Sequence, residues 1–166
     1  VEVIMKIVFR ADSSIYIGSG HIMRCLVLAS MLREHGHQVS FACRPQKGDL
    51  LDFVRNKGFE VKELIVPSEW STPKSSADYE AWLQVPWNVD VDSFVSKFDS
   101  VDLVIVDHYG INAEWEKHCK TQLQCKLFVI DDLLRPHNAD MILDQTLSRT
   151  PSEYDSPELE LSLIHI

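Results

Sequence analysis

The sequence predicts an α/β protein in which a parallel sheet carries helices on both faces. Short apolar, partly β-branched runs alternate with segments of helical spacing, and three strand-to-helix steps occur before residue 70. Two later apolar runs end in acidic residues, at 107 and at 131–132. Parallel strands bring such residues to one edge of the sheet. The 166 residues, 45% of them hydrophobic, suffice for one Rossmann-like domain with its own core.

The first half of the sheet is predicted from three apolar runs separated by helical segments. These strands are expected at 4–9, 39–43 and 59–66. The first helix has apolar residues at helical spacing from Ile22 to Leu32 and ends at Gly36, and the second covers 47–57 and ends at Gly58. Glycine is the usual residue just past a helix end because it accepts a positive φ.

The second half begins with an irregular segment, residues 67–90, that is rich in Pro, Ser and Thr and has a short helix near 77–83. Its scattered aromatic residues are expected to cover a sheet edge, and the alternative is stacking on a base or a sugar. The remaining helices are expected at 91–98 and from Asn112, a cap, to 124. The remaining strands are expected at 101–106, 126–130 and 141–143.

The composition excludes several classes of function. A net charge of −9 without any Lys/Arg cluster excludes a nucleic-acid-binding face. No apolar run reaches the roughly 18 residues of a membrane span. The four cysteines show no Cys-x-x-Cys spacing, which indicates a reduced, cytoplasmic protein. No leader precedes Met5, which resembles a natural start, so residues 1–4 are expected to be an upstream extension.

The loop between the first strand and the first helix contains the strongest candidate for chemistry. Gly18 and Gly20 are expected where the backbone approaches another group closely, and His21 falls in the first turn of the helix. The positive end of a helix suits an anion and favours an uncharged imidazole, which can accept a proton. Arg24 lies on the same helix face. The alternative is that His21 is only a polar residue at a helix start.

Three segments carry a resemblance to a known family. They are Phe9-Arg10-Ala11-Asp12-Ser13-Ser14 with Gly18-Ser19-Gly20-His21-Ile22-Met23-Arg24, then Asp107-His108-Tyr109-Gly110, then Asp131-Asp132-Leu133 with Arg135, His137, Asp140 and Asp144-Gln145. Together they resemble the UDP-sugar hydrolases of pseudaminic acid biosynthesis. That family releases UDP from UDP-2,4-diacetamido-2,4,6-trideoxy-β-L-altropyranose, serves nonulosonic acid synthesis and flagellin glycosylation, and belongs to the GT-B superfamily.

The resemblance implies that residues 5–158 are the amino-terminal Rossmann-like half of a GT-B fold. Residues 159–166 do not match the family, which would continue into a Gly-Pro-x-Tyr-like segment and a second domain. That domain, missing here, supplies most of the nucleotide pocket in such proteins, so this chain alone is expected to be inactive. Thr146 is a smaller departure, because family members commonly have Asn there.

The resemblance also implies a mechanism and a set of site residues. UDP is a good leaving group, so one base suffices: His21 would deprotonate a water that attacks the anomeric carbon with inversion. Tyr109, the second catalytic residue, would hydrogen-bond the water or the sugar. The substrate-binding residues are then expected to be Asp12, Gly18, Gly20, Arg24, Asp107 and His108. Asp107 has an alternative role as a turn cap, with Tyr109 packed over it.

Neither a metal nor a cofactor is expected. The pair Asp131-Asp132 has the chemistry to bind a hard cation, but the family needs none, and a capping role is the alternative. Three other functions compete with hydrolysis. They are a GT-B glycosyltransferase that passes the sugar to an acceptor, a dinucleotide-binding domain, disfavoured because Met23 stands where a third glycine is required, and a folded half without activity.

Overall fold

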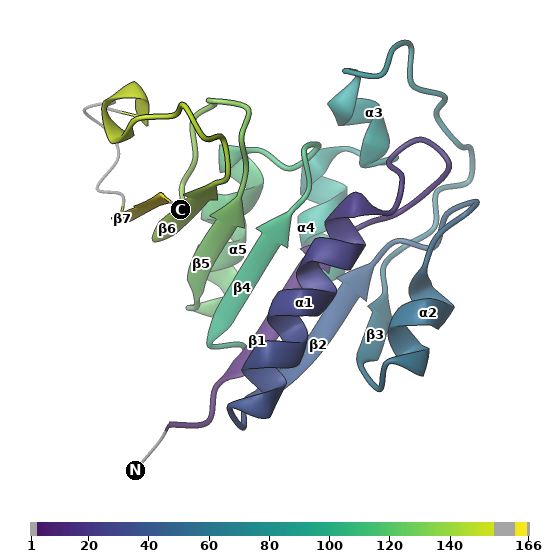
Figure 1. Ribbon diagram of the computed structural model, residues 1–166. Helices are drawn as coiled ribbons and strands as arrows, with labels where there is room; N and C mark the ends of the chain where they lie inside the picture. Colours follow the sequence, from purple (N-terminus) through teal and green to yellow (C-terminus); the bar gives the residue numbers. More distant parts are fainter. Residues whose placement is uncertain (1–2, 155–161, 166) are drawn as a thin grey trace.

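The computed structural model describes residues 3–154 and 162–165. Its centre is a seven-stranded, wholly parallel sheet with the strand order β3-β2-β1-β4-β5-β6-β7. Helices lie on both faces of this sheet (Figure 1). The predicted Rossmann-like α/β architecture is therefore confirmed.

The strands and helices follow one another along the chain as the sequence predicts. The strands are β1 (Lys6–Ala11), β2 (Gln38–Cys43), β3 (Glu60–Glu63), β4 (Leu103–Asp107), β5 (Lys126–Ile130), β6 (Met141–Asp144) and β7 (Ser162–His165). The helices are α1 (Gly20–Glu34), α2 (Leu51–Asn56), α3 (Tyr79–Trp82), α4 (Trp87–Val95) and α5 (Ala113–Leu123), with a 3-10 turn at Pro151–Tyr154.

Several predicted boundaries are wrong for local reasons. The second helix begins at Leu51, not at 47, because Gly48 turns the chain at φ +78° and Asp49 accepts the Leu51 N–H. The strand predicted at 59–66 ends at Glu63, because the Ile65 N–H is taken by a serine of α4 instead of a strand. Helix α4 starts at Trp87 and ends at Val95, earlier than the predicted 91–98. Neither the 3-10 turn nor β7 was predicted.

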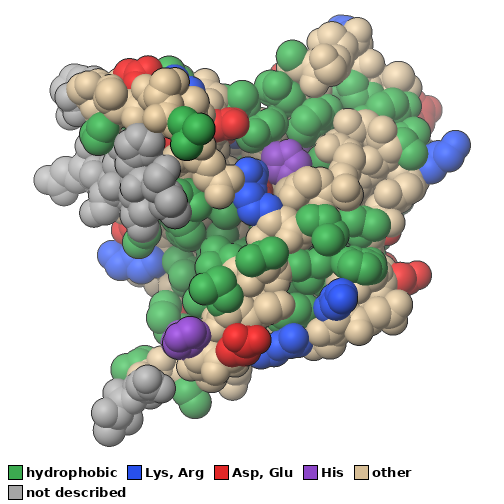
Figure 2. All heavy atoms as spheres, viewed as in Figure 1, with side chains coloured by type: hydrophobic (Ala, Val, Ile, Leu, Met, Phe, Trp, Pro, Cys, Tyr) green, Lys and Arg blue, Asp and Glu red, His purple; other side chains and the backbone are tan. Residues whose placement is uncertain are grey.

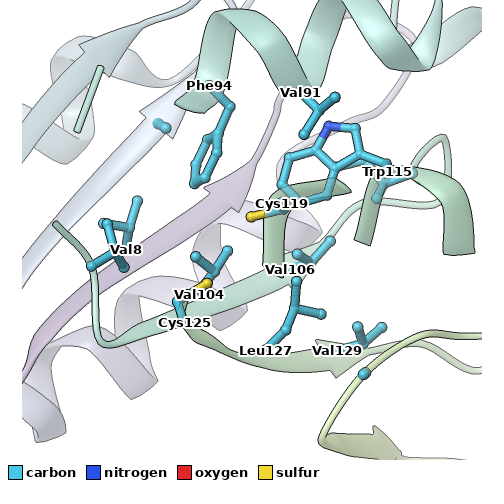
Figure 3. Packing of buried hydrophobic residues seen from close by; sticks show 14 of the residues in the cluster. Val8, Val91, Phe94, Val104, Val106, Trp115, Cys119, Cys125, Leu127 and Val129 are labelled. Atoms are coloured by element: carbon cyan, nitrogen blue, oxygen red, sulfur yellow. The ribbon is translucent and has the colours of Figure 1, made fainter. Parts of the chain in front are cut away.

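Two apolar layers hold the helices to the sheet. Helices α1 and α2 cover one face, where Phe9 and Phe41 of neighbouring strands stack with ring centroids 5.1 Å apart. Helices α4 and α5 cover the other face. There Phe94 and Trp115 pack over valines from the central strands, as Figure 3 shows. Helix α3 lies beyond the carboxyl ends of the strands, where a ligand site is expected in such a sheet.

A buried cluster of charges joins β1 to α4. Arg10 lies between two carboxylates: its Nη1 donates to Asp12 Oδ1 at 2.8 Å and its Nη2 to Asp90 Oδ2 at 2.7 Å. Arg44, just after β2, also donates to Asp90, and Trp115 Nε1 donates to Asp90 Oδ1 at 2.8 Å. The four charged side chains have no exposed surface, and two arginines balance two aspartates. Removing one partner would leave a buried charge unpaired, which is strongly destabilising.

A second buried cluster holds the loop after β5. The His137 ring lies between two carboxylates, with Nδ1 2.7 Å from Glu116 Oε1 and Nε2 2.6 Å from Asp131 Oδ2. Burial alone would lower the pKa of His137, but these two hydrogen bonds outweigh it and raise the pKa to about 9. His137 is therefore a cation at neutral pH, and it joins helix α5 to the end of β5.

We predict a pH dependence of stability from this cation. The folded pKa of about 9 lies above the ordinary value of 6.5, so the stabilisation is complete below pH 6.5 and is lost as pH rises through 9. The free energy of unfolding should fall by roughly 3 kcal/mol across this window. Urea titrations between pH 6 and 10 would measure it.

The variant His137→Gln should be less stable throughout and should lack this fall in stability. His35→Gln is the matched control, because His35 is an exposed histidine at the end of α1 and its loss should leave the profile unchanged. An unaltered fall in His137→Gln would contradict the assignment.

Candidate active site

Three histidines bond buried carboxylates near the carboxyl ends of the strands. They differ in whether a ring nitrogen is left without a hydrogen bond. His108 bonds Asp12 through Nε2 and accepts the Gly110 N–H at Nδ1. His137 is occupied at both nitrogens. His21 bonds Asp107 through Nδ1, and no described residue bonds its Nε2. Among these three, only His21 keeps a ring nitrogen available for a substrate.

Asp107 fixes the orientation of His21. The distance from His21 Nδ1 to Asp107 Oδ1 is 2.6 Å, and the carboxylate has no exposed surface. Burial alone would raise the pKa of Asp107, but the hydrogen bonds from His21 and Arg24 outweigh it and hold the pKa below its usual value. An ionised carboxylate can only accept, so Nδ1 carries a proton, and in the neutral imidazole the lone pair is then on Nε2.

Arg24 completes this cluster one helical turn after His21. Its Nε donates to Asp107 Oδ2 at 2.7 Å and its Nη2 to Asp107 Oδ1 at 2.6 Å, a two-point ion pair. A third nitrogen, Nη1, reaches Gln145 Oε1 at 3.1 Å, beyond the end of β6. The side chain is 31% exposed, so the guanidinium still borders the surface.

Aromatic rings surround the His21 imidazole. The Tyr109 ring meets it edge to face, with centroids 4.7 Å apart, and the Trp82 ring lies 6.1 Å away. Tyr79 packs against both Trp82 and Tyr109. The Tyr109 hydroxyl donates to Asp132 Oδ1 at 2.7 Å. Trp82 and Tyr79 from the irregular segment thus form one side of the site, and sequence reasoning did not include them among the site residues.

The loop between β1 and α1 (residues 12–19), here called the glycine loop, leaves space next to His21. Gly18 has φ +77°, a conformation that disfavours other residues, and its N–H donates to the Ser14 carbonyl at 2.8 Å. A Cβ at Gly18 or at Gly20 would meet no atom within 4 Å. The first turn of α1 has no acidic residue, and the Ser19 cap makes no side-chain hydrogen bond. The start of α1 is therefore open to an anion. No protein atom fills the space beside the two glycines.

Asp12, Asp107 and His108, which were predicted to bind substrate, are all buried. All three bond protein groups. Both Asp12 oxygens are occupied, by Arg10, by His108 and by the Arg44 N–H at 2.7 Å. Burial lowers the pKa of His108 more than the bond to Asp12 raises it. These residues support the site from below, where polar side chains need internal partners.

The structure shows why the Asp-His-Tyr-Gly segment ends in glycine, at Gly110. A Cβ there would lie 2.6 Å from the carbonyl oxygen of Tyr79. The absence of a side chain therefore lets α3 approach the end of β4 and brings its aromatic rings to His21.

Polar residues that follow two further strands, β5 and β6, border the site, although they were not predicted as site residues. Arg135 donates to Asp131 Oδ2 at 2.7 Å and to the Tyr109 carbonyl at 2.6 Å. Asp132 and Gln145 bond Tyr109 and Arg24. Their sequence signals were their place after apolar runs and their membership of the third motif segment. Within residues 3–154 and 162–165, no group of three or more His, Cys, Asp or Glu side chains could hold a metal ion. No described helix is long and apolar enough to cross a membrane.

The comparison with known proteins agrees with the resemblance seen in the motifs. The chain is 33% identical, over 151 residues or 91% of its length, to the UDP-2,4-diacetamido-2,4,6-trideoxy-beta-L-altropyranose hydrolase of Campylobacter jejuni subsp. jejuni serotype O:2. It spans 45% of the length of that relative. The predicted resemblance is confirmed. No protein-family model matches the chain.

We predict that Asp107→Asn disturbs the His21 ring. An amide presents either oxygen or NH₂ to Nδ1, so the single tautomer should become a mixture. Long-range ¹H–¹⁵N spectra should show the proton on Nδ1 in the wild type and on both nitrogens in the variant. Asp52→Asn, at a 92% exposed side chain of α2, should leave the His21 signals unchanged. A proton on Nε2 in the wild type would contradict the geometry.

We also predict that Gly110→Ala destabilises the fold by roughly 1–3 kcal/mol, because backbone at Tyr79 must move to admit the methyl group. Gly20→Ala, where the space is open, should change stability by less than about 0.5 kcal/mol. Urea unfolding of both variants would measure the difference. Equal stability would show that α3 does not depend on this contact.

Proposed function

We propose that this chain carries the reacting centre of a UDP-sugar hydrolase, with His21 as the general base. The observation that carries the proposal is the His21–Asp107 pair, whose 2.6 Å contact leaves the Nε2 lone pair free beyond the carboxyl ends of the strands. The substrate class follows the printed name of the Campylobacter relative, so we propose UDP-2,4-diacetamido-2,4,6-trideoxy-β-L-altropyranose as substrate and pseudaminic acid biosynthesis as the pathway.

In the proposed reaction, His21 Nε2 removes a proton from a water molecule as its oxygen attacks the anomeric carbon. The bond from that carbon to the diphosphate oxygen breaks, its electron pair leaves with UDP, and the configuration inverts. The diphosphate is a stable anion, so no carboxylic acid is needed to protonate it. The imidazolium formed on His21 remains bonded to Asp107 and returns its proton to solvent.

The neighbours of His21 have distinct roles in this proposal. Asp107 acts through His21 as a positioning residue, and Arg24 balances the Asp107 charge, so that the imidazole does not face an uncompensated anion. Tyr109, whose hydroxyl lies at the surface beside Asp132, is the group we propose to hydrogen-bond the water or the sugar. The open start of α1 would attract the diphosphate.

The nucleotide part of the site is a separate proposal. Because the chain spans 45% of its relative, we propose that UDP is held by sequence corresponding to the remainder, and that this chain alone has little activity.

A cytoplasmic location fits the four cysteines, which are all free and buried.

We predict that hydrolysis depends on His21. The chain, extended by sequence corresponding to the rest of the relative, should release UDP from the UDP-sugar without any acceptor. His21→Gln should lower the rate by about 10²–10⁴-fold, and Asp107→Asn by a comparable factor. UDP release followed by coupled assay would measure both. His35→Gln is the matched control.

Two outcomes would contradict the proposal. Near-normal turnover in His21→Gln would remove the base. A wild-type protein that leaves the UDP-sugar intact until an acceptor hydroxyl is added would favour the glycosyltransferase.

A further inference from the structure

A cavity lies beside the loop between β1 and α1. It has a volume of about 240 Å³, and its walls are mostly apolar. Its lining includes Ile15 and Tyr16 of the loop, Gln46 of the turn after β2, and Trp70 with Gln84 of the irregular segment. Ile15, Tyr16 and Trp70 are each about half exposed, which is high for large apolar side chains. Hydrophobic side chains gather at the surface on this side of the molecule, near α3 (Figure 2).

The walls of this cavity are held by hydrogen bonds within the protein. The Ile15 N–H donates to the Lys47 carbonyl at 3.0 Å, which joins the glycine loop to the turn after β2. The Gln84 side chain bonds both backbone groups of Ser71, at 2.7 and 2.8 Å, and Gln84 itself has the strained φ of +66°. The cavity is therefore formed before any ligand arrives, as small-molecule sites usually are.

One polar atom of this cavity lacks a partner. Among the side chains that the structure describes, Gln46 Nε2 is the single buried nitrogen or oxygen without a hydrogen bond. The residue is 9% exposed, and its backbone N–H is taken by Asp49 Oδ2 at 2.8 Å, so the turn is fixed while the amide is not. Buried polar groups are nearly always paired, and an exception calls for an explanation.

The cavity and the candidate active site are formed by the same two chain segments. Ser14, at its rim, pairs with Gly18 two residues before α1, which carries His21. On the other side, Gln84 follows two residues after Trp82, whose ring lies 6.1 Å from the His21 ring. The cavity therefore belongs to the same two chain segments that flank His21.

We propose that this cavity binds an acetamido substituent of the sugar, an inference that rests on the proposed function. An acetamido group combines a methyl with a carbonyl oxygen. The methyl suits the apolar side chains of Ile15 and Trp70, and the carbonyl oxygen can accept a hydrogen bond from the unpaired Gln46 Nε2. A hydroxyl in its place would not fill the apolar space and would not reach the Gln46 amide. The cavity would therefore select N-acylated sugars over ordinary hexoses.

The test is a titration of the ¹⁵N-labelled chain with two neutral sugars. The first probe is free 2,4-diacetamido-2,4,6-trideoxyaltrose, and the second is 6-deoxyaltrose, with hydroxyls in place of both acetamido groups. The first sugar should shift the Gln46 side-chain amide and the Trp70 indole signals, and its acetyl methyl should show saturation transfer from the protein. The second sugar should shift neither signal. Gln46→Leu should weaken binding of the first sugar about three- to tenfold. Gln122→Leu, on the exposed face of α5, should not.

The contrary results are distinct from failure of the hydrolase proposal. The acetamido site is overturned if the first sugar leaves Gln46 and Trp70 unshifted, if Gln46→Leu binds as well as the wild type, or if UMP shifts these signals and the sugar does not. The hydrolase proposal is tested by UDP release that depends on His21, which this titration does not use. The two experiments therefore distinguish failure of the acetamido site from failure of the hydrolase proposal.

Discussion

The structure depends on pairing the carboxylates that lie buried at the carboxyl ends of its parallel strands. Four neighbouring strands end at or just before one such group: Asp12, Asp107, Asp131 and Asp144. Each is paired with an arginine, and the first three also with a histidine. A buried carboxylate without a partner is costly, so each pair also holds a loop against the sheet edge. The rim of the site is built from these pairs.

The same chemistry gives different results at different strands. At Asp12 and Asp131 the histidine uses both ring nitrogens within the protein and acts as a structural link. At Asp107 the histidine comes from the start of a helix and keeps Nε2 free. Whether a ring nitrogen stays available therefore follows from where each histidine enters its cluster and not from its residue type. The proposed base is distinguished from its neighbours by an unused lone pair.

Much of the fold could be predicted because it follows from local pattern. The strand at 126–130 has the predicted bounds, and α5 begins after Asn112, whose side chain accepts the Trp115 N–H. A strand boundary failed where a nonlocal contact replaced a strand partner, at Ile65, whose N–H bonds a serine of α4. In the site, His21, Arg24 and Tyr109 were predicted together, but Trp82 and Gln46 lay in segments without periodicity. No local signal marks such residues.

The sequence by itself determined the layered sheet, the helix start that carries His21 and the resemblance to a UDP-sugar hydrolase, because hydrophobic periodicity, helix termini and motif residues act over short stretches of chain. Only the tertiary structure decided which polar residues are buried and which reach the surface. Asp12, Asp107 and His108 belong to the motifs, yet they pair beneath the surface with residues up to 96 positions away. Burial and pairing are properties of the folded state, in which distant segments meet, so no single stretch of sequence specifies them.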